Sequence, residues 1–363
     1  MRFPEFEGEW EKKRLGGIGD VKMCRRVFNN ETSPTGDIPF FKIGSFGKVA
    51  DAFISKELYL DYKNRFSFPK QGDILISAAG TIGRTVVYDG EDAYFQDSNI
   101  VWIENDNKMI TNNFLYYIFQ IVKYNTEGGT IQRLYNNILK STKFNAPSIT
   151  EQNKIASFLS LIDERISTQN KIIEELTLLK NTLRYLLFEQ ILIEDIKLVS
   201  IKDVLNYEQP TKYLVSDTDY SSDASKIPVL TANKSFVLGY TNEKFGIYDK
   251  GECIIFDDFT MDLKFVDFPF KVKSSAIKIL TPKLNVNLRF VFEYLCFMNL
   301  SSTDHKRHYI SEIESTEIKL PNIKKQNFVA IFLSNIDNKI KTEFEIYSQL
   351  NTQKQYLLSK LFI

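Results

Sequence analysis

The sequence PSITEQNKIASFLSLIDERIS at residues 147–167 recurs as PNIKKQNFVAIFLSNIDNKIK at residues 321–341. The offset between the copies is a constant 174 residues, and the longer stretches 147–188 and 321–362 are identical at 18 of 42 positions without a gap. A repeat of this length predicts an internal duplication, in which the same long segment follows each of two globular stretches.

Apolar residues in both copies recur at alternating steps of four and three, the spacing of a coiled-coil seam. In the first copy the seam positions are Ile155, Leu159, Ile162, Ile166, Gln169, Ile173, Leu176, Lys180, Leu183 and Leu187. In the second copy they are Val329, Leu333, Ile336, Ile340, Glu343, Tyr347, Leu350, Lys354, Leu357 and Leu361. A surface helix also carries an apolar stripe, but ten consecutive steps kept twice favour a coiled coil.

Polar residues interrupt both seams at matched positions, Gln169 with Glu343 and Lys180 with Lys354. Such residues lower stability but can fix register. We expect two helices of about 40 residues, each about 60 Å long, that pair antiparallel and hold the two globular domains at opposite ends of a spacer. Ser148 and Glu151 form a candidate capping box for the first helix, whereas Lys325 interrupts the box after Asn322.

The two globular stretches contain short apolar runs broken at Gly and Asp, followed by an amphipathic helix, which is typical of a mixed α+β domain. They match loosely at Ile38-Pro39 with Ile227-Pro228, at Gly72-Asp73-Ile74 with Gly251-Glu252-Cys253, and at Asn113 with Asn287, after which the offset is 174. We therefore predict a pseudo-two-fold α+β chain. Its four segments are a first domain (1–146), a first helix (147–195), a second domain (196–313) and a second helix (314–363).

The composition indicates a folded protein, with 43% hydrophobic residues and equal numbers (46 each) of Lys+Arg and Asp+Glu. A neutral chain lacks the basic excess usual in nucleic-acid-binding domains, so any DNA-binding face must arise from spatial arrangement and should bind weakly alone. The scattered Cys24, Cys253 and Cys296 suit buried, reduced thiols. An acidic start without a signal peptide or membrane-length apolar run leads us to expect a soluble cytoplasmic protein.

The paired helices, each after a domain with a GDILIS-like or GECIIF-like strand and a closing Arg-x-Tyr segment, resemble the specificity subunit of type I restriction-modification systems. The resemblance covers essentially the whole chain. It implies two target-recognition domains that each read half of a split, asymmetric DNA site, and a helix pair that spaces the half-sites and docks two methyltransferase subunits. Restriction subunits are further partners that it suggests. It implies no catalysis and no cofactor in this chain; S-adenosylmethionine, ATP and Mg²⁺ would belong to partners.

Three kinds of segment in each domain are candidates for DNA contact. Glycines in a turn let the backbone approach phosphates, and arginine pairs with phosphate or a guanine edge. The candidates in the first domain are Lys42, Ser45, Ser77, Gly80, Thr81, Gly83, Arg84, Gln132, Arg133, Tyr135 and Asn136. Those in the second domain are Lys234, Ser235, Asp258, Thr260, Lys264, Lys306, Arg307, His308 and Tyr309.

Each candidate also has a structural interpretation. The glycine turn suits a plain hairpin, the tyrosines could pack a domain against its helix, and the aspartates could belong to a solvated turn. His305 and His308 lack further ligands at metal-binding spacing, so we predict no metal site. Two other functions stay open: a Mg²⁺-dependent nuclease using Asp257, Asp258 and Asp262, and a coiled-coil scaffold without DNA readout.

Overall fold

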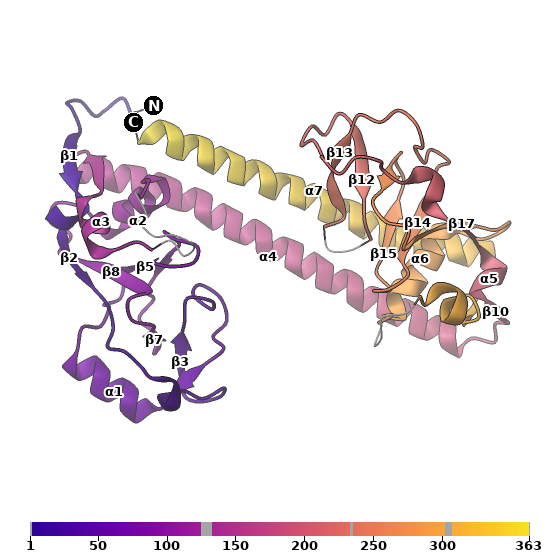
Figure 1. The fold of residues 1–363 in the computed structure, drawn as a ribbon, viewed down its shortest axis with the longest axis horizontal. Coiled ribbons are helices and arrows are strands. Elements are labelled where there is room, and N and C mark those ends of the chain that lie inside the picture. Colours follow the sequence, from indigo (N-terminus) through magenta and orange to yellow (C-terminus); the bar gives the residue numbers. More distant parts are fainter. Residues whose placement is uncertain (1, 125–132, 233–234, 302–306, 363) are drawn as a thin grey trace. The chain divides into compact units, whose positions relative to one another are not determined.

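The computed structural model describes residues 2–124, 133–232, 235–301 and 307–362. The chain divides into two compact units, one formed by Met1–Thr168 with Tyr347–Ile363 (unit 1) and the other by Gln169–Ile346 (unit 2) (Figure 1). Within the described ranges, no helix is both long and apolar enough to cross a membrane.

Unit 1 contains a four-stranded sheet, a three-stranded sheet and a two-stranded ribbon. The four-stranded sheet has the order β2 (Gly19–Lys22), β8 (Ile100–Asn105), β5 (Ile74–Ser77), β6 (Thr85–Val87). The three-stranded sheet has the order β4 (Phe53–Ile54), β3 (Ile38–Phe41), β7 (Tyr94–Phe95), and the ribbon pairs β1 (Glu11–Arg14) with β9 (Lys143–Ala146). The helices of this domain are α1 (Lys56–Arg65), α2 (Asn112–Ile121) and α3 (Asn136–Ser141).

Unit 2 repeats this topology strand by strand. Its four-stranded sheet has the order β11 (Leu205–Glu208), β17 (Ile277–Pro282), β14 (Cys253–Asp257), β15 (Leu263–Val266). Its three-stranded sheet has the order β13 (Val237–Thr241), β12 (Ile227–Leu230), β16 (Lys271–Val272), and its ribbon pairs β10 (Leu198–Ser200) with β18 (Glu317–Lys319). The short α5 (Ile201–Val204) and α6 (Leu288–Phe297) complete it. The duplication therefore includes the globular domains, as predicted.

Hydrogen bonds at the N-termini of α2 and α6 correct the predicted alignment of the two domains. Thr111 caps α2 and its N–H donates to Gln152 Oε1 (3.0 Å), while Asn287 caps α6 and its N–H donates to Gln326 Oε1 (2.9 Å). Asn287 is thus the counterpart of Thr111, not of Asn113, and α2 matches α6 at an offset of 176.

The predicted match of Gly72-Asp73-Ile74 with Gly251-Glu252-Cys253 also shifts by one residue where the strands begin. Ile74 and Ile254 both face the core beneath the helices, whereas Cys253 faces the other side of its sheet. Ile74 is therefore equivalent to Ile254, so β5 matches β14 at an offset of 180. The second domain also ends later than predicted, because β18 pairs with β10 and α7 begins only at Ile323.

The two long helices are α4 (Ile149–Ile193) and α7 (Ile323–Leu361). Every seam position is buried or half-buried. In unit 1, Ile155 near the start of α4 shares a core with Leu361 at the end of α7. In unit 2, Phe188 near the end of α4 shares a core with Leu333 near the start of α7. In each unit the two helices therefore run antiparallel.

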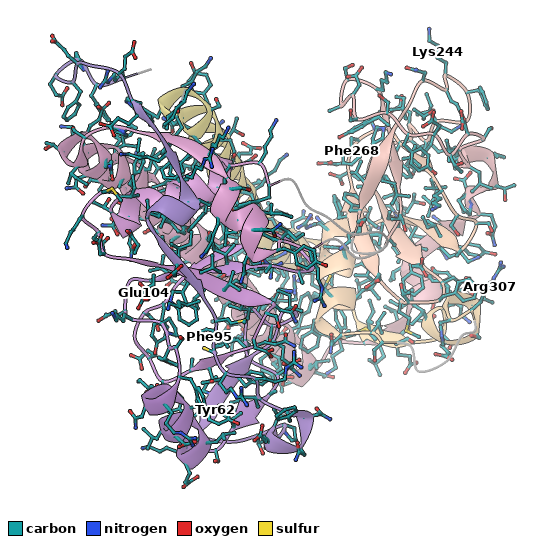
Figure 2. The ribbon with its side chains drawn as sticks, turned by 60° about the vertical axis from the view of Figure 1, so that its left-hand side comes forward. Tyr62, Phe95, Glu104, Lys244, Phe268 and Arg307 are labelled. Atoms are coloured by element: carbon teal, nitrogen blue, oxygen red, sulfur yellow. The ribbon has the colours of Figure 1, made fainter. Side chains whose placement is uncertain are left out.

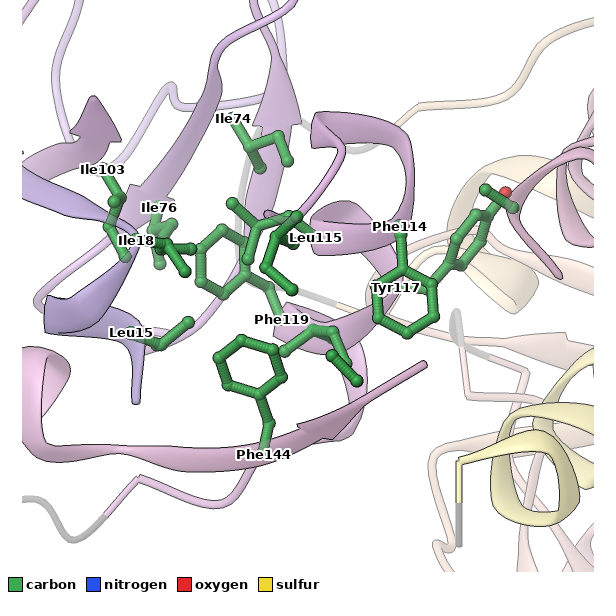
Figure 3. Packing of buried hydrophobic residues seen from close by; sticks show 14 of the residues in the cluster. Leu15, Ile18, Ile74, Ile76, Ile103, Phe114, Leu115, Tyr117, Phe119 and Phe144 are labelled. Carbon is green, nitrogen blue, oxygen red and sulfur yellow. The ribbon is translucent and has the colours of Figure 1, made fainter. Parts of the chain in front are cut away.

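The helix ends are continuous with the domain cores. Leu115 and Phe119 of α2 pack with Phe144 of β9 in the same cluster as Ile155 and Leu159 of α4 (Figure 3). Each domain thus buries its own α-helix against the coil as well as against its sheet. Burial of apolar surface of this kind supplies most of the favourable free energy of folding.

The caps of the long helices follow the predicted residues only in part. Ser148 Oγ lies 3.5 Å from Glu151 N, and Asn322 Oδ1 accepts from Lys325 N (3.1 Å). The Glu151 carboxylate does not close a capping box; it is buried and bound by Arg2 (2.7 Å). The counterpart of Glu151, Lys325, instead pairs with Glu194.

Polar contacts interrupt the seam where the sequence predicts them. In unit 2, Gln169 Nε2 donates to the Glu343 backbone oxygen (3.1 Å) and carboxylate, and Lys180 pairs with Asp337 (2.7 Å). In unit 1, Lys354 pairs with Asp163 (2.7 Å). The 174-residue repeat relates Lys180 to Lys354 and Asp163 to Asp337, so each ion pair is the counterpart of the other.

A buried carboxylate lies beside the helix pair in unit 2. Glu293 of α6 is 0% exposed and lies 3.1 Å from Lys180, 2.8 Å from Arg184 and 3.1 Å from Arg289. Burial alone would raise the pKa of Glu293, but the three cations outweigh burial and hold this pKa below its ordinary value.

We expect Glu293→Gln to destabilise unit 2 by about 3–5 kcal/mol at neutral pH, because three cations would lose a buried counter-charge. Because the pKa of Glu293 is depressed in the folded protein, its stabilising contribution is fully present above the ordinary glutamate pKa of about 4.5. This contribution is lost as the pH falls through the lower pKa of the folded state. Denaturant unfolding of the wild-type chain and the variant should show a difference in unfolding free energy that shrinks as the pH is lowered from about 6 to about 3. A difference independent of pH would contradict the ionised state of Glu293.

Candidate nucleic-acid interface

The glycine turn of unit 1 joins β5 to β6 and is closed by the residues at its ends. Ser77 Oγ accepts from Arg84 N (2.8 Å), and Gly83 N donates to the Ser77 backbone oxygen (2.9 Å). Gly80 and Gly83 have φ values of +63° and +82°, which residues with a side chain rarely adopt. The turn presents Gly80 and Thr81 to solvent, while Ser77 is buried beneath it.

Two further candidate segments of unit 1 meet this turn. The Arg84 guanidinium donates to the Phe46 backbone oxygen (2.9 Å), which ties the turn to the loop after β3. Leu134 N donates to the Ala78 oxygen (2.9 Å), which brings the segment beginning at Arg133 alongside. Segments 42–48, 77–84 and 133–136 therefore form one surface, which we call patch 1.

Patch 1 presents side chains suited to phosphates and base edges. Arg133, Tyr135, Asn136 and Lys48 are exposed. Lys42 is half-buried and lies 3.4 Å from Asp51, and Ser45 is buried, where its Oγ accepts from Lys42 N (3.2 Å). The structure thus places Ser45 and Ser77 as supports of the loops and not as contact residues.

Unit 2 brings two of the corresponding segments together in the same way. His308 N donates to the Asp258 backbone oxygen (3.0 Å), as Leu134 N does to Ala78 in unit 1. This contact sets the exposed Arg307 beside the β14–β15 turn, and Figure 2 shows its side chain at the surface. Ser235, Thr260 and Arg307 are exposed, and Lys264 is half-buried. We call the surface of segments 258–264 and 307–309 patch 2.

Three residues of patch 2 that were predicted to contact DNA are too deeply buried to touch it directly. Asp258, His308 and Tyr309 are at most 2% exposed. Asp258 lies 3.3 Å from the buried Lys278 and accepts from Tyr309 N (2.8 Å). The Tyr309 ring packs on Tyr207 and Phe256. These three residues support the surface from below, so the prediction that they touch DNA needs this correction.

The identical tyrosines of the two Arg-x-Tyr segments thus have different surroundings. Tyr135 is 47% exposed, whereas Tyr309 is 1% exposed. The strand positions that carry Tyr207 and Phe256 in unit 2 hold Val21 and Ile76 in unit 1, by the strand registers. Of the remaining candidates, Gln132, Lys234 and Lys306 lie outside the described residues, as does His305.

The aspartates of the β14–β15 turn are held by hydrogen bonds of the turn itself. Asp257 Oδ1 accepts from Phe259 N (2.9 Å) and Thr260 N (3.0 Å), and Asp262 accepts from the Thr260 hydroxyl (3.0 Å). Across the residues that the structure covers, no group of three or more His, Cys, Asp or Glu side chains is placed to hold a metal ion. The carboxylates that motivated a nuclease are therefore accounted for by local structure.

Residues 7–178 and 193–352 match the family model of the type I restriction modification DNA specificity domain. The chain belongs to this family. The two matched ranges correspond to the two repeats, each a domain with much of its following helix.

Relatives of the same family align with parts of the chain. A type I restriction enzyme specificity subunit of Haemophilus influenzae is 54% identical over 165 residues, which are 45% of this chain and 42% of that protein. The EcoR124I/EcoR124II specificity subunit of Escherichia coli is 45% identical over 133 residues, 35% of this chain and 33% of that protein. The chain thus spans less than half the length of these two curated relatives.

Two other matches cover the whole chain. The MjaX specificity subunit of Methanocaldococcus jannaschii is 25% identical over 408 aligned positions, covering 98% of this chain and 93% of that protein. The crystal structure of the type I restriction-modification S subunit from M. genitalium superposes with a TM-score of 0.65 at 18% identity, covering 100% and 99% of the two chains. The latter likeness supports the fold.

The supporting role of Asp258 in this specificity-family domain is open to test. We expect Asp258→Asn to lower the stability of unit 2 by about 3–5 kcal/mol, because the buried Lys278 would lose its counter-charge. Asp262→Asn removes an exposed carboxylate of the same turn and is the matched control, with an expected change below about 0.5 kcal/mol. Equal stability of the two variants in chemical denaturation would contradict the structural role.

Proposed function

We propose that this chain is the DNA-specificity subunit of a type I restriction-modification complex, and that it reads a bipartite, asymmetric target with one half-site for each domain. The observation that carries the proposal is the paired construction of patches 1 and 2. In both, a backbone hydrogen bond from the closing segment sets an exposed arginine, Arg133 or Arg307, beside a turn of the four-stranded sheet. An arginine at such a place can bind a guanine base bidentately or contact a phosphate of the DNA backbone.

The two turns favour different half-sites. The turn of patch 1 has seven residues between its strands, 78–84, with two positive-φ glycines and Arg84; the turn of patch 2 has five, 258–262, ordered by Asp257. Turns of different length and chemistry present different groups to a groove. A recognition sequence with two unlike halves follows, separated by about one helical turn of DNA, ~34 Å, if both lie on one face.

We further propose that methyltransferase subunits dock on the helix pair, in the cytoplasm, and that this chain contributes no catalysis. Large apolar side chains on the outer faces of the helices support docking: Leu178 is 68%, Phe328 63% and Ile331 62% exposed. Phe328 and Phe332 stack on each other at the surface of α7. A contiguous exposed apolar patch of this kind is typical of a protein contact. S-adenosylmethionine, ATP and Mg²⁺ would be bound by the methyltransferase and restriction subunits.

The neutral charge of the chain has a consequence for binding. Affinity for DNA without sequence preference rests mainly on phosphate neutralisation by Lys and Arg. With 46 residues of each sign, the isolated chain should bind DNA weakly, and firm binding should require the assembled complex.

Removal of the patch arginines tests the proposed readout. We expect Arg133→Ala and Arg307→Ala each to weaken binding of the assembled complex to its site by about 1–3 kcal/mol and to relax preference in one half-site. Fluorescence anisotropy with site variants measures both effects. Lys108→Ala, an exposed cation outside both patches, is the control.

Unchanged DNA affinity in both arginine variants, together with lowered thermal stability, would show that the arginines are structural. A reconstituted complex that protects no split site in footprinting would favour a scaffold without readout. Cleavage by the purified chain with Mg²⁺ and no partner would favour the nuclease.

Exchange of one domain tests its independence. We expect replacement of residues 1–146 by the domain of another family member to change one half-site of the methylated sequence and to leave the other unchanged, because each patch is built within its own unit. Sequencing of methylated DNA gives both halves at once. A change in both halves would contradict one half-site for each domain.

A further inference from the structure

The two units differ at one groove beside the helix pair. In unit 1 a groove of about 340 Å³ lies over α2 and α4, and its walls include Asn113, Tyr116, Tyr117, Asp163 and Glu164. Asn113 and Glu164 are exposed at its mouth. None of these five residues belongs to patch 1.

The repeat relates each wall of this groove to a residue of unit 2. The offset of 176 between α2 and α6 pairs Asn113 with Arg289, Tyr116 with Phe292 and Tyr117 with Glu293, which lies 3.1 Å from Arg289. The offset of 174 between α4 and α7 pairs Asp163 with Asp337.

In unit 2 the corresponding space holds the Arg289 side chain. Its guanidinium lies 5.1 Å from the centre of the Phe292 ring and 4.7 Å from that of Phe265, and it bonds to Asp337. Asp337 therefore receives two cations, Arg289 and Lys180. The counterpart of Phe265 in unit 1 is Val87, which also lines the groove.

Unit 1 keeps a carboxylate and an aromatic ring, Asp163 and Tyr116, but lacks the arginine, and Tyr117 replaces Glu293. Asp163 forms an ion pair with Lys354 (2.7 Å) and accepts a hydrogen bond from the Tyr117 hydroxyl (2.9 Å). Asn113 stands in the place of Arg289. Unit 1 also has Glu164 where unit 2 has Asn338. Unit 2 in turn has the buried Glu293 where unit 1 has Tyr117. These positions therefore carry two carboxylates in each unit, and unit 1 has one cation fewer.

We propose that the groove of unit 1 binds the guanidinium of an arginine side chain from a partner protein. The Tyr116 ring offers an aromatic face and Asp163 with Glu164 offer carboxylates, the two surfaces on which a guanidinium stacks and pairs. Arg289 shows that this chain binds such a group at the equivalent site of its own second repeat. The partner is the methyltransferase subunit, and that identity rests on the proposed function.

The chemistry of the groove favours a protein over DNA as the source of its occupant. Two carboxylates repel a phosphate backbone, and the groove lies on α2 and α4, where the domain meets the helix that would dock the methyltransferase subunit. An ammonium group could pair with Asp163 but would gain less from the planar face of Tyr116.

Binding of a free guanidinium tests the groove without any partner. We expect N-acetyl-L-arginine amide to shift the ring signals of Tyr116 and Tyr117 in ¹³C-tyrosine NMR spectra of the full chain, and the neutral N-acetyl-L-citrulline amide to leave them unchanged. Glu164→Gln should weaken the arginine response, and Asn113→Arg should abolish it by filling the groove as Arg289 does. The absence of any arginine-specific response in the wild-type chain would overturn the proposal and leave the proposed function standing.

Assembly with the cognate methyltransferase subunit tests the partner. We expect Asn113→Arg to weaken assembly about tenfold or more, because the partner arginine would meet an occupied site. Asn113→Gln, which lengthens the side chain without adding a charge, should stay within about twofold. Thermal unfolding of the free variants checks that both fold. Wild-type affinity in a folded Asn113→Arg variant would overturn the assignment to this partner, and a wild-type chain that fails to assemble would instead refute the proposed function.

Discussion

The register of the helix pair fixes which residues of the two long helices meet, and the core of each unit includes residues of both helices. An apolar seam alone tolerates sliding by one heptad, because each step presents a similar surface. Polar partners at single seam positions remove that freedom, since a shifted register would leave a buried amide or carboxylate without its partner. Gln169 bonds to Glu343 in unit 2, and the ion pairs Lys180–Asp337 and Asp163–Lys354 are related by the repeat.

The helix pair also contributes to the domain cores. Ile155 and Leu361 share a cluster with Phe114 in unit 1, and Phe188 and Leu333 share one with Phe290 in unit 2. A change of helix register would therefore disturb the packing beneath each sheet. The turns and closing segments of patches 1 and 2 are attached to these same sheets, so the helix pair and the two patches share one packed core within each unit.

The helices were predictable from the sequence because a buried seam repeats its apolar positions and the two copies align without a gap. The domains were predictable only in outline, since their loops differ in length. The Asn113–Asn287 identity was misleading: the α2 cap is a threonine and the α6 cap an asparagine, so matching the asparagines shifts the helix by two residues. That shift also concealed the correspondence of Asn113 with Arg289.

The candidate contact residues could be named by type but not by exposure. Arg133 and Arg307 are at the surface as expected, whereas Asp258 is neutralised by Lys278, which lies 20 residues away in sequence on a neighbouring strand. Tyr309 is buried by two rings whose counterparts in unit 1 are not aromatic. Burial of this kind depends on strand pairing across the sheet, which no local pattern reveals.

A helix pair with one register should give a recognition sequence with one gap. Mapping methylated positions across the genome of a cell that carries this chain with its methyltransferase subunit tests this most directly. We expect a single motif of two unlike half-sites separated by a fixed number of unspecified bases. A continuous motif, or half-sites separated by variable gaps, would contradict this expectation.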